Sequence, residues 1–300
     1  MITIFSTPKK FEGHIKVIQT NAIKSWTLLE PKCEVILFGK EQGTAEIAEK
    51  LNIRHIPDVK TNEFGTPLVN HMFADAEKIA SFPVLAYVNS DIILCRDFTR
   101  AAGRIKMKKF LLVARRWNVR IDEYIDFNDK EWDKKICMKI REGGSIGAPT
   151  GIDLFVFTKG IWKGLPPFAI GRASYDPKLL YFAYCGNVPL VNISPAAKAI
   201  HQNHTYSHHP HGKNGVYYGE EARRNKQLIK NGITNLCIRN ASFILTKCGC
   251  LPALTLGHLQ AVLRTLPYRV KIKSISRFLR FIKHAGDNSF ILKKLEHLDI

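Results

Sequence analysis

The 300-residue sequence lacks the glycine-rich fingerprints of the commonest nucleotide-binding folds. No G-x-G-x-x-G follows the first apolar run, and no G-x-x-x-x-G-K-[ST] occurs anywhere in the chain. These absences argue against a Rossmann-type dinucleotide site and against a P-loop. A nucleotide, if one is bound, must therefore be held by other means.

Long apolar runs and paired cysteines are also missing. No stretch approaches the ~20 apolar residues of a membrane span, and the first five residues lack the charged and apolar regions of a signal peptide. The seven cysteines are scattered, and Cys248 and Cys250 form the only close pair, with too short a spacing for the usual zinc loop. We therefore expect a reducing, cytoplasmic setting, with the inner face of a membrane as a further option.

Acidic residues are scarce. The 45 Lys and Arg residues outnumber 26 Asp and Glu, which gives a formal net charge of +19. Such a surplus favours an anionic partner such as a nucleotide, a phospholipid, an acidic polymer or nucleic acid. Nucleic acid is not expected, because no stripe of stacking aromatic residues is interleaved with the basic ones.

Six basic residues and no acidic one lie between Arg269 and Lys283, and apolar residues recur there at a spacing of three to four. This pattern predicts a basic amphipathic helix. Such a helix either makes peripheral contact with a membrane through residues 269–283 or packs its apolar stripe on the rest of the protein.

Strands and helices alternate through the first part of the chain. Strands are predicted at residues 2–5, 35–38, 54–59, 84–88 and 110–114, and helices at 14–29, 44–51, 66–81 and 98–105. In the third of these helices Thr66 is expected to cap the amino end, with Pro67 in the first position. Alternation of this kind predicts an α/β fold with a parallel sheet, to which 152–157 and 188–193 add two further strands.

A polar triplet, Asn89-Ser90-Asp91, interrupts the most apolar stretch of the chain. It falls at the carboxyl end of the fourth predicted strand, where open α/β sheets bind their ligands. A carboxylate there can hold a divalent cation, and the cation can hold phosphate. The alternative is that Asn89 and Asp91 only form a turn and cap the next element of the chain.

Histidines gather in one loop. Five of the eleven lie within residues 201–213, and neutral imidazole is the commonest protein ligand of metals. We expect at least one of them to bind metal or phosphate. Another carboxylate, Asp176, precedes Pro177 and is either a functional group or the cap of a helix.

The strand-end triplet, Thr150–Phe155, Pro166–Arg172 and the histidine loop together resemble a GT-A-type glycosyltransferase of the family-two-like group, over roughly residues 1–230. The resemblance implies a Rossmann-like GT-A fold with a central, mostly parallel sheet flanked by helices. It implies a donor-binding half at 1–117 and an acceptor or catalytic half at 118–235 of the same domain. A basic helical region would follow at 236–300.

The resemblance also implies a metal site. Similar enzymes have Asp-x-Asp at the strand end and bind Mn²⁺ or Mg²⁺, which bridges the donor diphosphate; here the first position is Asn89. Asp91 would hold the metal, with His201 or His204 completing its coordination. Asp176 would be the general base of an inverting reaction, and Asp153 is either its rival or a group that orients a sugar.

The donor is expected to be a UDP- or GDP-sugar, and the acceptor a hydroxyl of a glycan or a lipid-linked glycan. By resemblance, the donor-contacting residues are Thr7, Gly39, Gly65, Thr66, Asn70, Asn89, Asp91, Arg115 and Arg116. Two other function classes remain alternatives at this point: a sugar-phosphate nucleotidyltransferase, and a non-enzymatic basic protein that binds membranes or polyanions.

Overall fold

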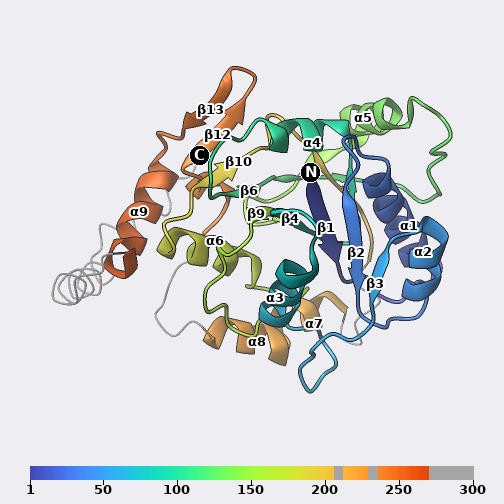
Figure 1. The fold of residues 1–300 in the computed structure, drawn as a ribbon, viewed down its shortest axis with the longest axis horizontal. Coiled ribbons are helices and arrows are strands. Elements are labelled where there is room, and N and C mark those ends of the chain that lie inside the picture. Colours follow the sequence, from blue (N-terminus) through green and yellow to red (C-terminus); the bar gives the residue numbers. More distant parts are fainter. Residues whose placement is uncertain (206–211, 229–235, 270–300) are drawn as a thin grey trace.

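The computed structural model of the chain describes residues 1–205, 212–228 and 236–269 (Figure 1). Two sequence expectations fall partly outside these ranges. They are the basic amphipathic helix, beyond residue 269, and the histidines at positions 208, 209 and 211 of the histidine loop.

Nine strands of the described residues form one sheet, in the order β13-β12-β10-β6-β9-β4-β1-β2-β3. Their bounds are β1 (Ile2–Ser6), β2 (Glu34–Phe38), β3 (Arg54–Ile56), β4 (Val84–Val88), β6 (Leu111–Val113), β9 (Leu154–Thr158), β10 (Leu190–Asn192), β12 (Phe243–Thr246) and β13 (Gly249–Pro252). β9 runs antiparallel to β4 and β6, and β13 runs antiparallel to β12; the other neighbours are parallel. The predicted central, mostly parallel sheet is thus confirmed.

Helices cover both faces of this sheet (Figure 1). Successive side chains of a strand point to opposite faces, so Phe5 packs with α3 (Val69–Ile79) and α6 (Asp176–Cys185), on one side. Ile4 packs on the other side with α1 (Gly13–Thr27), α2 (Thr44–Leu51) and α4 (Arg96–Gly103). The result is a three-layer α/β/α arrangement with one apolar core on each side of the sheet.

Helix α3 begins later than the sequence predicts. It starts at Val69 after an extended Leu68, and Thr66 and Pro67 precede it. Pro67 forms an isolated bridge with Thr61, and Leu68 forms one with Ala169, so this stretch pairs as extended chain. The expected cap by Thr66 is therefore wrong, because those backbone groups bond across to other segments.

A second, smaller sheet has the order β5-β11-β7-β8. Its strands are β5 (Ile92–Leu94), β11 (Ala199–Gln202), β7 (Arg116–Val119) and β8 (Ser145–Ile146), and helix α5 (Trp132–Gly143) packs on it through a cluster that includes Trp132 and Ile200. The sequence pattern predicted neither β5 nor β11. Their pairing matters for the site, because it sets His201 opposite Ile92, the residue after Asp91.

The region from residue 236 is not purely helical, contrary to expectation. Strands β12 and β13 extend the large sheet, and α9 (Leu256–Arg269) follows them. β12 pairs with β10, and its Leu245 is buried in the core on the α1 side of the sheet, which stabilises this pairing. Over the described residues, none of the helices combines the length and the apolar character needed to cross a bilayer. The seven cysteines are free thiols.

Candidate active site

A cavity of about 1130 Å³ opens at the carboxyl ends of β1, β2 and β4, and most of the predicted site residues line it. These are Thr7, Gly39, Gly65, Thr66, Asn89, Asp91, Arg116, Asp153, Asp176, His201 and His204. Two predicted donor residues do not line it. Asn70 lies on α3, and the Arg115 guanidinium donates to the carbonyl of Gly147.

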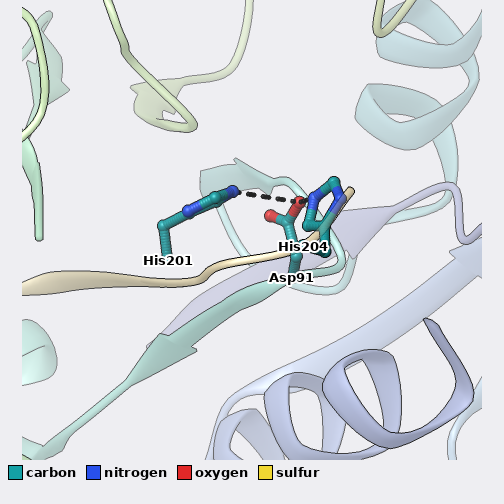
Figure 2. Close-up of side chains that lie close together, drawn as sticks. All are labelled: Asp91, His201 and His204. Carbon is teal, nitrogen blue, oxygen red and sulfur yellow. Dashed lines mark hydrogen bonds and ion pairs between the residues drawn. The ribbon is translucent and has the colours of Figure 1, made fainter. Parts of the chain in front are cut away.

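Asp91 and two histidines form a compact cluster in this cavity (Figure 2). The Nε2 atoms of His204 and His201 lie 3.1 Å and 3.7 Å from Asp91 Oδ2. One ligand atom from each of the three residues lies within 4.8 Å of the others. The sequence could not separate His201 from His204, and the structure brings both to the same carboxylate.

The backbone of Asp91 is held by Gln202, a fully buried residue of β11. The Gln202 side-chain amide donates to the carbonyl of Asp91 at 3.1 Å and to that of Ile18 at 2.7 Å. Its carbonyl accepts from Asn21 at 3.1 Å. Strand β11 therefore supplies His201. Its next residue, Gln202, holds the backbone of Asp91 in place.

The electrostatics of the cluster favour a cation. Burial would raise the pKa of Asp91, but the charges of His201 and His204 outweigh burial and hold it well below its usual range. Burial in turn lowers the pKa of His201, against the opposing effect of Asp91. His204 Nδ1 lies 2.8 Å from the carbonyl of Thr205. When Nδ1 of neutral His204 donates to the Thr205 carbonyl, the lone pair of Nε2 faces the Asp91 carboxylate. A cation between Nε2 and the carboxylate would stabilise this arrangement.

Two buried atoms of the cluster lack a hydrogen-bond partner in the described part of the chain: Asp91 Oδ1 and His201 Nδ1. A buried polar atom without a partner is costly and calls for an explanation such as an ion or a water molecule. One carboxylate and two imidazoles are ligands that transition metals accept. The residues of this cluster therefore fit a divalent metal ion.

A second polar cluster surrounds Asp153. Asn89 Nδ2 donates to Asp153 Oδ1 at 2.6 Å, and Arg116 Nη1 donates to Oδ2 at 2.8 Å. The hydroxyls of Tyr87 and Tyr175 point at Asn89 Oδ1, at 2.8 Å and 3.4 Å. Both Asp153 oxygens are thus engaged, one by the amide of Asn89 and the other by the guanidinium of Arg116.

Arg116 reaches Asp153 across two glycines. A Cβ at Gly147 would lie 2.8 Å from Arg116 Cγ, and a Cβ at Gly151 would lie 3.4 Å from its Nε. Gly147 thus leaves room for the Arg116 side chain, because a larger residue there would clash with it.

Asp176 is the first residue of α6 rather than its N-cap, which is Tyr175. The capping interpretation of this carboxylate is therefore wrong. Burial, and next the charge of Asp153, raise the pKa of Asp176 to about 8. The turn before it contains Gly171 and Ser174 at φ +66° and +81°, values that L-residues adopt at a cost. A carboxyl with a pKa near neutrality in a cavity is a candidate acid or base.

Lys9 and Arg172 are two of the cavity-lining cations that the sequence did not predict as site residues. Lys9 follows β1, and its backbone is fixed by Gln19, which bonds both its N–H and its carbonyl. Burial lowers the pKa of Lys9, while Asp91 and Asp153 raise it and Arg172 lowers it. Arg172 donates to Glu221 at 2.6 Å and to Thr66 at 3.2 Å. A usable signal existed for Lys9, since its position after a parallel strand places it at the same sheet edge as Asp91.

No protein-family description matches the chain. No curated protein sequence matches it either. Among solved structures, the chain is similar to Staphylococcus aureus TarS 1–349 in complex with UDP-GlcNAc, with 16% identity and a TM-score of 0.46 over 68% of this chain and 58% of the other.

It is also similar to Mycobacterium tuberculosis glucosyl-3-phosphoglycerate synthase, with 12% identity and a TM-score of 0.43 over 76% and 78% of the two chains. A third similarity is to the mannosyltransferase PcManGT from Pyrobaculum calidifontis in complex with GDP-Man and Mn²⁺ (11%, TM-score 0.39, 66% and 56%). These structural similarities are to GT-A glycosyltransferases. The match to TarS spans less than two thirds of that chain. All three TM-scores lie below 0.5.

Proposed function

We propose that this protein is a glycosyltransferase that moves a sugar from a nucleotide-diphosphate sugar to an acceptor hydroxyl, with inversion at the anomeric carbon. One observation carries this proposal. A single cavity at the carboxyl edge of parallel strands contains the Asp91–His201–His204 cluster together with Asp176, a carboxyl whose pKa is raised to about 8. The first group suits a cation that binds diphosphate, and the second suits a base.

Asp91, His201 and His204 would hold the divalent cation. Two imidazole ligands favour Mn²⁺ over Mg²⁺, because Mg²⁺ prefers oxygen ligands and keeps much of its water. When bound, the ion would neutralise negative charge that develops on the departing diphosphate.

Cationic side chains of the chain would share that role. Lys9, Arg116 and Arg172 all line the cavity. In a partly desolvated cavity, positioned charges stabilise a developing anion more strongly than they do in water. Thr7, Gly39, Gly65 and Thr66 would flank the nucleotide, a UDP or GDP moiety. Gly39 suits close approach of a ligand, because it has φ +101° and a Cβ there would lie 3.3 Å from Thr7 Oγ1.

Asp176 would act as the general base. Its carboxylate takes the proton of the acceptor hydroxyl while the acceptor oxygen bonds to the anomeric carbon and the bond from that carbon to the diphosphate oxygen breaks. Asp153, fixed by Asn89 and Arg116, would accept hydrogen bonds from sugar hydroxyls and so orient the ring. The acceptor hydroxyl belongs to a glycan or a lipid-linked glycan in this proposal.

The test is the nucleotide affinity of an Asp91→Asn variant. We expect the parent to bind UDP or GDP more tightly with Mn²⁺ than without it, and the variant to lose at least about tenfold of that Mn²⁺-dependent gain, because loss of a supporting group alone costs 10- to 100-fold. Titration calorimetry with both nucleotides measures the change.

Asp75→Asn is the matched control, because Asp75 pairs with Lys78 at the surface of α3 and does not line the cavity. Equal Mn²⁺-dependent affinities for the Asp91 variant and the parent would contradict the proposed metal site. Failure of both nucleotides to bind the parent would contradict the proposed donor.

A further inference from the structure

Leucine side chains lie exposed on α9 and on the segment that leads into it. Leu254 is 97% exposed, Leu256 77%, Leu263 59%, Leu259 54% and Leu251 48%. We call these five residues the leucine surface. Figure 1 shows α9 at the outer edge of the molecule, next to β12 and β13. Contiguous exposed apolar side chains usually mark a contact with a partner or a membrane.

Helix α9 is already anchored by its other side. Ala261 and Thr265 are buried, and Ala261 belongs to the core that includes α6. Leu256, Leu259 and Leu263 follow a three-to-four spacing, so they share one face of the helix. Leu256, Leu259 and Leu263 therefore form a second face of α9, because the helix packs on the core through the face that carries Ala261 and Thr265.

The sequence that contains the leucine surface carries charge of a single sign. Residues 222–286 contain 13 Lys and Arg residues and no Asp or Glu. Within the described part of this stretch, Arg239 and Lys247 are exposed. Arg239 also lies beside the start of α9, since its carbonyl accepts from Thr255 Oγ1. Apolar side chains set among cations, with no anion along the sequence, are complementary to an anionic bilayer.

We propose that the leucine surface docks the protein on the headgroup region of an anionic phospholipid bilayer. The leucines enter the boundary between headgroups and acyl chains, and the exposed cations Arg239 and Lys247 contact the lipid phosphates. A second copy of the chain is a poorer occupant, because it would set two cationic surfaces against each other. The proposal goes beyond glycosyl transfer and stands independently of it.

The experiment is flotation of the full chain with phosphatidylcholine vesicles that contain or lack phosphatidylglycerol. We expect binding only to the anionic vesicles, weakened by salt as charges are screened. A Leu254→Glu, Leu259→Glu double variant should lose at least about tenfold in vesicle affinity, because each buried leucine contributes about that factor. Its melting temperature should match that of the parent, since both side chains are exposed.

Met138→Glu is the control, because Met138 is an exposed apolar residue of α5, outside the leucine surface. It should bind vesicles as the parent does. Equal vesicle binding by the double variant and the parent would overturn the proposal, as would failure of the parent to bind anionic vesicles. A parent dimer that the double variant dissociates would overturn it in favour of a second copy.

Discussion

The amide at position 89 shows how one residue changes the charge of the site. Asn89 donates to Asp153 Oδ1 at 2.6 Å. A carboxylate in its place would face Asp153 at that distance, and the repulsion would force one of the two to keep a proton. With Asn89, Asp153 accepts a hydrogen bond from the amide and pairs with Arg116 through its other oxygen. Asn89, close to Asp91 in the chain, therefore forms an amide–carboxylate pair with Asp153, where a second aspartate would have placed two carboxylates together.

Asp176 should make the transfer rate depend on pH. A base must be deprotonated to act, and burial, with the charge of Asp153, raises the pKa of this carboxyl to about 8. The rate should therefore rise with pH and level off above about pH 8. Initial rates at saturating donor measure the profile.

Asp176→Asn should lower turnover by about 10²–10⁴-fold, the usual contribution of a general base. Donor affinity should stay within about twofold of the parent's, because the proposed donor contacts are made by other residues. Unaltered turnover in the variant would exclude Asp176 as the base. Asp153→Asn is the informative comparison, since it should change donor or acceptor affinity as well.

Lys9→Met should weaken the binding of diphosphate and spare that of the nucleoside. The Lys9 ammonium lines the cavity close enough to Asp91 and Asp153 to interact with both charges. We expect about a tenfold loss in affinity for UDP or GDP and none for uridine or guanosine, because only the former carries the charge. Lys16→Met, an exposed lysine of α1, is the control. Equal losses for nucleotide and nucleoside would contradict a phosphate contact.

At the scale of elements, the β5–β11 pairing brings Asp91 and His201 together. Strand β11 is antiparallel to β5 and parallel to β7, which fixes His201 beside the strand that leaves Asp91. α8 (Glu220–Gln227) plays a similar part at Arg172 and Thr66, on another wall of the cavity. Its Glu221 accepts from Arg172 at 2.6 Å and from Asn62 at 2.7 Å, and so ties the helix to the loop before Thr66.

Gln202→Leu should damage the cluster without touching a metal ligand. The change removes hydrogen bonds to the carbonyls of Asp91 and Ile18 and leaves both without that donor. We expect a loss of about 1–3 kcal/mol in the free energy of unfolding and a loss of about 10- to 100-fold in Mn²⁺ affinity. Chemical denaturation and Mn²⁺ titration measure the two effects. Gln227→Leu, an exposed position of α8, should change neither; a metal affinity equal to the parent's would contradict the supporting role of Gln202.

At the scale of the whole molecule, the buried carboxyl of Asp176 should lower the free energy of unfolding as pH rises. Its pKa is 3.8 in the reference state and about 8 in the fold, so between these values the unfolded chain releases a proton that the folded chain keeps. Stability contributed by the protonated group is therefore lost as pH rises from about 4 to about 8.

Asp176→Asn removes that loss, because an amide stays neutral. Its melting temperature should exceed the parent's by a margin that grows from pH 4 to pH 8, at about 2 to 4 °C per kcal/mol. Calorimetry at several pH values checks this. Asp75→Asn should show no such trend, and a melting temperature for Asp176→Asn at or below the parent's at pH 8 would contradict the burial cost.

Local pattern determined much of this fold. The alternation of strands and helices through residue 114 gives the parallel core of the sheet, because apolar period and turn residues are properties of short segments. The same pattern sets Asp91 after β4, at the sheet edge where ligands bind. Composition likewise indicates an anionic partner. The boundaries proposed at residues 117 and 235 stay predictions, and the large sheet runs through all three regions.

Only the tertiary structure decided which distant residues meet. Asp91 is 113 positions from His204, and Asn89 is 64 from Asp153. The strands that bring Asp91 and His201 together, β5 and β11, are too short to leave a periodic signal. Their pairing, the fixed Gln202 amide and the insertion of β9 between parallel strands depend on contacts made after the chain has folded. The local sequence thus indicates which residues are candidates for binding and catalysis. It does not show that His201 and His204 meet at Asp91.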